Sequence, residues 1–244
     1  MEENAEVIRS PEKTQRGWTE PLPGRLLARA FFEDAPEHVA PRLLGKILVR
    51  KTKERKLIAG RIVEVEAYLG PHSQQPDAAA HAHRGLTERN RVLFGPPGHA
   101  YVYSIYGRYF CMNISCEPEG RAGCVLLRAL EPVAGLDQMA RNRGLKSGAA
   151  ARELAGGPSR LCQALGLTRE THNGIDLLDP ASPLLVWEGG EPVGRILVTR
   201  RIGIRDAAEL PLRFAVAGNA CVSGPKNLAG ECIALRGQKT FLRG

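Results

Sequence analysis

The segment from Leu57 to Tyr68 constrains the fold most, because its side chains alternate in the manner of a β-strand. One face of this strand suits a protein core and carries Val63, Val65 and Ala67. The opposite face carries Glu64, Glu66 and Tyr68. Two carboxylates and an aromatic ring on one face, running into a long loop, predict the floor of a site. The alternative is a solvated outer face on which glutamates pair with arginines.

Other short strands and a few helices are predicted around this segment. Further strands are expected over residues 46–50, 100–105, 109–116, 124–131, 184–187, 196–200 and 212–216. Helices are expected over residues 36–44, 87–94, 136–142 and 159–165. Runs of strands interrupted by unevenly placed helices indicate an α+β fold with a mostly antiparallel β-sheet.

The chain length of 244 residues allows one domain with a sizeable core and is short for two. Residues 1–24 are polar and show no periodicity, so we expect a flexible N-terminal tail. From residue 25 to 244 no linker-like break interrupts the pattern, which predicts a single domain. No apolar run is long enough to span a bilayer, and the acidic start argues against a secretory signal.

The net charge of +8 suggests a polyanionic partner, because lysines and arginines near phosphates release condensed counterions. A merely basic protein is the alternative, and charge by itself does not separate the two. The six cysteines include no C-x-x-C pair. This argues against a structural zinc site and fits a reducing cytoplasm.

Four of the five tyrosines lie between residues 101 and 109. Tyr106 falls at the turn of a predicted hairpin, where its ring is expected to point outward beside Arg108. Such a ring is suited to wedge between stacked bases, and Tyr103 on the strand face is placed to stack on an extruded base. The alternative is that the tyrosines fill the sheet, which accounts well for Tyr101 and Tyr109 and poorly for a residue at the tip.

Polar residues in otherwise apolar or irregular segments are further site candidates. His81 and His83 share the long loop over residues 70–85, so a metal site has to be considered. That loop offers no regular ligand helix, which favours a histidine facing a base pocket, with His83 as a possible surface residue. Asn113 lies on a predicted strand. Arg128 interrupts an apolar strand, so it needs Glu66, a substrate anion or an ordinary core salt bridge as its partner.

The residues Gly157, Pro158 and Ser159 are typical of the start of a helix. The free amides at such an N-terminus are suited to receive a backbone phosphate of a nucleic acid. An ordinary helix cap is an equally good explanation.

Several segments, in the same order along the chain, resemble the alkyladenine (3-methyladenine) DNA glycosylases. They are residues 62–71, 87–91, 101–107, 110–115, 124–132 and 157–165. The resemblance covers roughly residues 26–218, far more than one short motif. It implies a single domain with a curved, mostly antiparallel β-sheet, flanking helices and a protruding β-hairpin.

The resemblance also implies a role for each matching residue. Glu66 corresponds to the catalytic base that activates the attacking water, and Arg128 and the backbone carbonyl of Ile202 correspond to groups that hold this water. The residues implied to line the pocket of the flipped base are Tyr68, His81, Tyr103 and Asn113, with Asn113 discriminating against guanine. Tyr106 corresponds to the wedge in the duplex. Contacts to the DNA backbone are expected at Arg108, Gly157 and Ser159.

One essential glutamate is sufficient for such a reaction. Hydrolysis of an N-glycosidic bond passes through an oxocarbenium-like sugar, and a carboxylate near C1′ stabilises this cation and deprotonates a water. An alkylated purine already carries positive charge and leaves without a second acid, so Glu64 is assigned to an ion pair. No lysine lies between residues 57 and 132, which argues for water rather than an amine as nucleophile.

The sequence therefore predicts a monofunctional DNA glycosylase of base excision repair. Its expected substrate is double-stranded DNA with 3-methyladenine, 7-methylguanine, hypoxanthine or ethenoadenine. We expect no cofactor, no metal and no membrane, a monomer, and a location at the nucleoid in the cytoplasm, or in the nucleus of a eukaryote. The alternatives are a non-catalytic basic nucleic-acid-binding protein, a purine nucleoside hydrolase and an RNA-modifying enzyme of similar fold.

Overall fold

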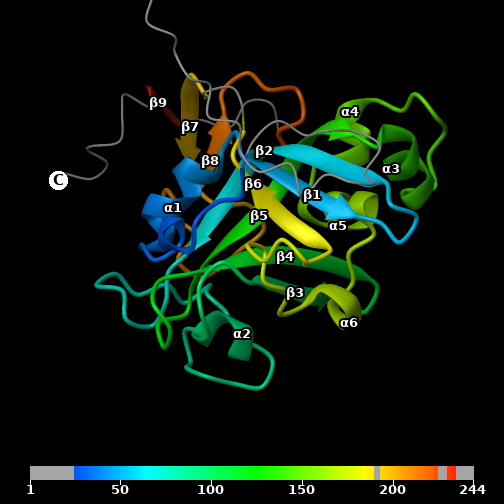
Figure 1. The fold of residues 1–244 in the computed structure, drawn as a ribbon. Coiled ribbons are helices and arrows are strands. Elements are labelled where there is room, and N and C mark those ends of the chain that lie inside the picture. The colour runs from blue at the N-terminus through cyan, green and yellow to red at the C-terminus, as the bar shows by residue number, and fades with distance from the viewer. Residues whose placement is uncertain (1–24, 190–192, 225–229, 235–244) are drawn as a thin grey trace, which may run out of the picture.

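Strand β2 (Leu57–Tyr68) organises the fold of the computed structural model, which describes residues 25–189, 193–224 and 230–234. One edge of β2 pairs with β5 (Gly123–Ala134) along most of its length. The other edge pairs first with β1 (Ile47–Lys51) and then with β8 (Arg213–Val216). β2 thus holds together strands from the beginning, the middle and the end of the chain (Figure 1).

A β-bulge interrupts the β2–β5 ladder where the other edge of β2 changes partner. The register leaves Val63 of β2 and Arg128 of β5 without a partner. Bulges re-aim side chains, and Val63 accordingly joins a small separate cluster, whereas Val65 and Ala67 join the main core. Of the three residues expected to share one core face, only the two beyond the bulge do so.

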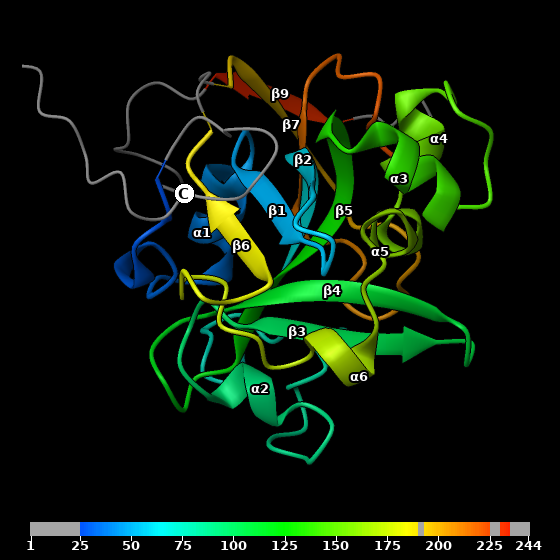
Figure 2. The same ribbon diagram turned by 45° about the vertical axis from the view of Figure 1, so that its right-hand side comes forward.

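The remaining strands extend the sheet on both sides. They are β3 (Ala100–Ile105), β4 (Tyr109–Cys116), β6 (Leu184–Trp187), β7 (Arg195–Thr199) and β9 (Glu231–Ala234). The sheet order is β3-β4-β5-β2-β8-β7-β9, with β1 beside β2 and β6 beside β1. Every pairing among the described strands is antiparallel. The curled sheet with flanking helices confirms the predicted α+β class (Figures 1 and 2).

Short helices cover the sheet. They are α1 (Pro36–Leu43), α2 (Arg91–Phe94), α3 (Leu136–Asn142), α4 (Ala151–Ala155), α5 (Pro158–Leu165) and α6 (Arg169–His172), preceded by the 3₁₀ turn η1 (Arg29–Phe31). α1 packs against β2 and β5, and α5 packs against β4 and β5. Both helices bury apolar side chains in the main core of the sheet.

Most predicted elements lie where the pattern placed them, and the differences have local causes. Helix α2 begins at Arg91 rather than at Thr87, because Thr87 and Asn90 first close a turn through reciprocal hydrogen bonds. The elements α4, α6 and β9, of four or five residues each, were not predicted.

Two sequence predictions concern residues outside the described ranges, namely the tail over residues 1–24 and the end of the domain after residue 234. Within the described ranges, no helix combines the length and the apolar character that crossing a membrane requires.

Strands β3 and β4 pair with each other farther than β4 pairs with β5. The β3–β4 register reaches Ile105 opposite Tyr109, whereas the β4–β5 register ends at Asn113 opposite Leu126. The outer part of the hairpin therefore leaves the sheet, and Figure 2 shows its turn at the edge of the molecule beyond α5 and α6. In the fork between β4 and β5, the segment that leads into α5 forms a bridge with Ala129.

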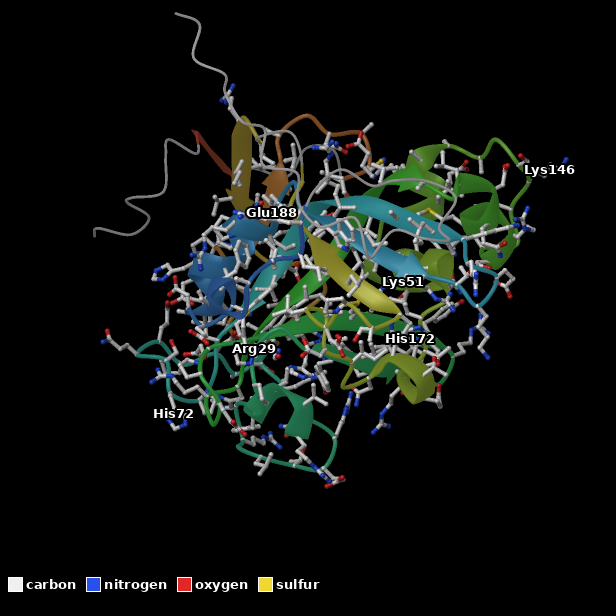
Figure 3. All side chains as sticks on the ribbon, in the orientation of Figure 1. Arg29, Lys51, His72, Lys146, His172 and Glu188 are labelled. Atoms are coloured by element: carbon white, nitrogen blue, oxygen red, sulfur yellow. The ribbon has the colours of Figure 1, made fainter. Side chains whose placement is uncertain are left out.

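His172, the last residue of α6, is buried although it can be protonated (Figure 3). Its Nδ1 accepts a hydrogen bond from the amide of Thr168 at 3.2 Å and lies 2.7 Å from the hydroxyl of Thr171. Burial, and then the nearby Arg50 guanidinium, lower the pKa of His172 to about 4. The folded protein therefore holds this imidazole neutral at pH values where an unfolded chain protonates it.

This lowered pKa makes the stability of the protein sensitive to acid. Since an unfolded histidine has a pKa near 6.5, stability from His172 is lost as the pH falls from about 6.5 to about 4. We expect the drop in Tm between pH 7 and pH 5 to be smaller in His172→Gln than in the wild type, by about 4 to 8 °C. His72→Gln, at an exposed histidine, is the control. Equal drops in wild type and His172→Gln would contradict the expectation.

Candidate active site

Glu66 lies at the centre of the candidate site, and its carboxylate has no exposed surface. The amide of Ile202 donates to Oε1 at 2.7 Å, and the Tyr68 hydroxyl donates to Oε2 at 3.0 Å. A guanidinium nitrogen of Arg128 lies 3.2 Å from Oε1. Three groups from three segments of the chain therefore hold the carboxylate in one orientation.

Glu64 is also fully buried, and it is bound by a second arginine. Its Oε1 accepts from Nε of Arg213 at 2.7 Å and from Nε of Arg128 at 3.0 Å. The amide and the hydroxyl of Ser223 donate to the same carboxylate at 2.5 and 2.9 Å. The predicted ion pair of Glu64 is confirmed, whereas the alternative of a solvated face is wrong.

Arg128 contacts both Glu64 and Glu66. Carboxylate partners of this kind were expected for an arginine inside an apolar strand. It is the bulged residue of β5, so its side chain leaves the regular ladder and reaches both carboxylates. Coulombic attraction to Glu66 and then to Glu64 outweighs the cost of burial and raises the pKa of Arg128. The guanidinium therefore stays charged beside Glu66.

The strand register aligns the predicted pocket residues on one face of the sheet. Glu66 pairs with Leu126, Leu126 with Asn113, and Asn113 with Tyr101. Residues paired across strands point to the same face, so this row runs over four strands, and Asn113 is buried within it. Tyr103 follows Tyr101 on that face, and their rings stack with centroids 5.5 Å apart.

The stacked rings of Tyr101 and Tyr103 form an aromatic wall. His81, rather than His83, reaches this wall from the loop over residues 70–85. Its Nδ1 lies 3.0 Å from the Tyr101 hydroxyl, and its ring meets the Tyr103 ring edge to face at 4.5 Å. His81 keeps part of its surface in solvent, whereas the side against the tyrosines is desolvated. Burial, and then the nearby Arg89, lower the pKa of His81, so its imidazole is neutral near pH 7.

The phenol groups of Tyr68 and Tyr103 remain protonated. Burial, followed by the charge of Glu66, raises the pKa of Tyr68, and burial raises the pKa of Tyr103. Both hydroxyls are therefore hydrogen-bond donors at neutral pH. Among the described residues, no group of three or more His, Cys, Asp or Glu side chains is arranged to hold a metal ion.

Tyr106 stands at the tip of the hairpin with 91% of its surface exposed. Its backbone has a φ of +50° and the following Gly107 a φ of +70°, so both central residues of the turn are left-handed. This turn type matches the twist of a hairpin, but it is strained for a tyrosine. The neighbouring Arg108 lies over the ring of Tyr109 and donates to its hydroxyl at 2.8 Å.

The start of α5 fills the fork between β4 and β5. Gly157 is buried and its amide donates to the carbonyl of Ala155, whereas Ser159, the second residue of the helix, interacts with the thiol of Cys111. Cys111 pairs with Tyr103 on β3. The residues predicted to contact the DNA backbone at this helix therefore lie close to the aromatic wall.

The match to known proteins is extensive. The family model described as methylpurine-DNA glycosylase matches residues 30–220. The chain belongs to the methylpurine-DNA glycosylase family. It is thus a DNA glycosylase, a hydrolase of N-glycosyl bonds, as the sequence motifs predicted.

Relatives from three organisms match more than four-fifths of the chain. A protein of Koribacter versatilis is 52% identical over 83% of this chain and 95% of its own length. One of Methanoculleus marisnigri is 48% identical over 81% of this chain and 98% of its own, and one of Burkholderia lata is 45% identical over 83% and 93%. Each carries the provisional name 3-methyladenine DNA glycosylase.

Several residues around the site of the glycosylase were not predicted. They are Asp77, Arg201, Arg213 and Ser223, together with Tyr101 as the partner of His81. Arg213 interrupts an apolar strand in the same way as Arg128, so the same reasoning could have found it. Ser223 and the Asp77–Arg201 pair carry no local signal, because their partners lie more than 100 residues away.

The Glu64 network is expected to dominate the local stability. Glu64→Gln leaves Arg213, a fully buried cation, without its carboxylate. Removal of one partner of a buried ion pair costs about 3 to 5 kcal/mol. Urea unfolding should show that loss for Glu64→Gln, and about 0 to 1 kcal/mol for Glu131→Gln, whose carboxylate lies 3.7 Å from Arg61 at the surface. Equal losses would contradict the structural role of Glu64.

Proposed function

We propose that this glycosylase removes alkylated or deaminated purines from double-stranded DNA by flipping the base into the pocket beside Glu66. The observation that carries the proposal is the cross-strand row, in which a buried, rigidly held carboxylate shares one face of the sheet with Asn113 and with the stacked rings of Tyr101 and Tyr103. A purine needs such a wall for stacking, and its sugar needs the carboxylate. The names of the relatives support the same substrate class.

In this proposal Glu66 deprotonates a water molecule, which attacks C1′. The Glu66 carboxylate also stabilises the oxocarbenium-like sugar. Arg128 and the carbonyl of Ile202 hold the water, and Arg128 and the amide of Ile202 keep the carboxylate in place. Glu64 is not a second acid, because two arginines and Ser223 occupy its oxygens. An alkylated purine is cationic while it is attached, and it leaves as a neutral base that takes the electron pair of the glycosidic bond. A neutral purine leaves after protonation on its ring.

The pocket distinguishes purines by stacking and by hydrogen bonds. Tyr103 and His81 form an edge-to-face corner against which a flipped base can pack, with Tyr68 on the side of Glu66. Nδ1 of the neutral His81 lies 3.0 Å from the Tyr101 hydroxyl, which leaves the other ring nitrogen for the base or its phosphate. Asn113 opposes the exocyclic amine of guanine and so disfavours the undamaged base, whereas 7-methylguanine, which has the same amine, carries a positive charge that makes it leave readily. The proposed substrates are 3-methyladenine, 7-methylguanine, hypoxanthine and ethenoadenine.

The proposal assigns recognition of the duplex to the hairpin tip and to the start of α5. Tyr106 fills the gap left by the flipped base, and Arg108 contacts the backbone beside it. At the start of α5, Ser159 offers the first amide without an intrahelical partner, while Gly157 shapes the turn before it. Lys146, which projects from the α3–α4 loop (Figure 3), adds positive charge.

We propose further that the glycosylase works as a monomer without a cofactor, at the nucleoid of the cytoplasm. An exposed aromatic residue at a strained tip has no use in a hydrolase of free nucleosides. The hairpin tip therefore favours duplex DNA over a small substrate.

Replacement of the catalytic carboxylate tests the mechanism. Glu66→Gln keeps the shape of the side chain but removes the base, so we expect excision to fall by about 100-fold or more. The assay uses duplex oligonucleotides with one hypoxanthine or ethenoadenine, in EDTA, followed by alkaline cleavage at abasic sites. Undiminished excision by Glu66→Gln would exclude Glu66 as the base. A wild type that excises neither lesion, nor any alkylated purine, would refute the proposed function.

Removal of the ring at the hairpin tip tests the wedge. Base flipping costs a few kcal/mol in a duplex and much less in a single strand. Tyr106→Ala should therefore slow excision of hypoxanthine from duplex DNA by about tenfold and leave the single-stranded substrate nearly unaffected. Single-turnover rates on both substrates measure the difference, and equal losses would argue against a wedge.

A further inference from the structure

A buried ion pair, Asp77 with Arg201, lies beside the candidate active site. Nη1 and Nη2 of Arg201 donate to the two oxygens of Asp77 at 2.7 and 2.8 Å, and neither side chain has exposed surface. The pair joins two segments that are 124 residues apart in the sequence. One is the loop that carries His81, and the other follows β7 and carries Ile202.

On one side of the pair, Asp77 is bonded to backbone groups next to pocket residues. It accepts from the amide of Leu69, which directly follows Tyr68, at 3.0 Å. It also accepts from the amide of Ala79, two residues before His81, at 3.2 Å. The Asp77 carboxylate thus ties the end of β2 to the loop that brings His81 to the tyrosines.

On the other side, Arg201 contacts the residues around Glu66. It donates to the carbonyl of Ala67 at 3.0 Å, and its guanidinium lies 4.6 Å from the centre of the Tyr68 ring. The next residue, Ile202, donates its amide to Glu66 at 2.7 Å. A shift of Arg201 would therefore move both a ring of the pocket and a ligand of the catalytic carboxylate.

The chemistry of the pair suits positioning better than stability. A buried ion pair often gains little over apolar side chains of similar size, because both charges lose their hydration. A two-bond contact between arginine and carboxylate does fix distance and angle. In this molecule, the groups fixed in that way are those that surround the flipped base.

We propose that Asp77 and Arg201 are positioning residues that set the separation between the His81–Tyr68 side of the pocket and the carboxylate of Glu66. The inference rests on the proposed function, because the geometry that the pair fixes is that of the proposed pocket. Loss of the pair should slow the chemical step more than it weakens binding to the duplex, since Tyr106 and the other proposed DNA contacts lie elsewhere.

The test compares Asp77→Asn, Arg201→Met and the double variant. Each single variant leaves one charge buried without a partner, so its Tm should fall. The double variant leaves no unpaired charge, and its Tm should recover most of the loss. Its single-turnover rate on a hypoxanthine duplex should nevertheless stay roughly 10- to 100-fold below the wild type, while its Kd for a duplex with a tetrahydrofuran abasic analogue changes much less.

Asp34→Asn is the matched control, because Asp34 also pairs with an arginine and accepts a backbone amide, but it lies just before α1 rather than at the pocket. Its excision rate should equal that of the wild type. A double variant that regains its full rate together with its Tm would overturn the positioning role.

Hydrogen exchange of the backbone provides a measurement that does not depend on activity. In the double variant, amides over residues 78–83 and 201–207 should exchange faster than in the wild type, and unchanged protection would overturn the inference. Wild type and Glu66→Gln are run in the same assay. An inactive wild type would refute the proposed function, and exchange would still decide whether the pair holds the two loops.

Discussion

The contact of Arg128 with two buried carboxylates is the interaction on which the rest of the site depends. Together with Arg213, these groups form a set of four charges that sums to zero inside the sheet. Charges removed from water are tolerated only when they are paired and hydrogen-bonded. Oε1 of Glu64 accepts hydrogen bonds from Nε of Arg213 and from Nε of Arg128. Another guanidinium nitrogen of Arg128 interacts with Glu66.

The backbone is arranged to make this contact possible. A regular ladder would point Arg128 in the direction set by its neighbours, but the bulge separates it from the register of β5. The same irregularity coincides with the change from β1 to β8 along the other edge of β2. The change of strand partner along β2 and the contact of Arg128 with Glu66 therefore occur at the same irregularity.

Features that depend on neighbouring residues could be predicted from the sequence. The limits of β3 and β4 follow from alternation and from the turn at Tyr106, and the need of Arg128 for a carboxylate follows from its apolar surroundings. The Asp77–Arg201 pair could not be predicted, because only the folded chain brings its loops together. The bulge was also invisible, since Val63 fits an unbroken strand pattern as well as an interrupted one.

The bulge in β2 also limits which changes of chain length the molecule can absorb. Successive residues of a strand face opposite sides, so deleting one residue between Ile62 and Val65 would turn either Glu66 or the whole first half of the strand to the wrong side. The exposed stretch from Pro71 to Gln75 has no strand partner and can lengthen or shorten freely. Insertions and deletions among relatives should therefore collect in that loop and be absent from the few residues before Glu66.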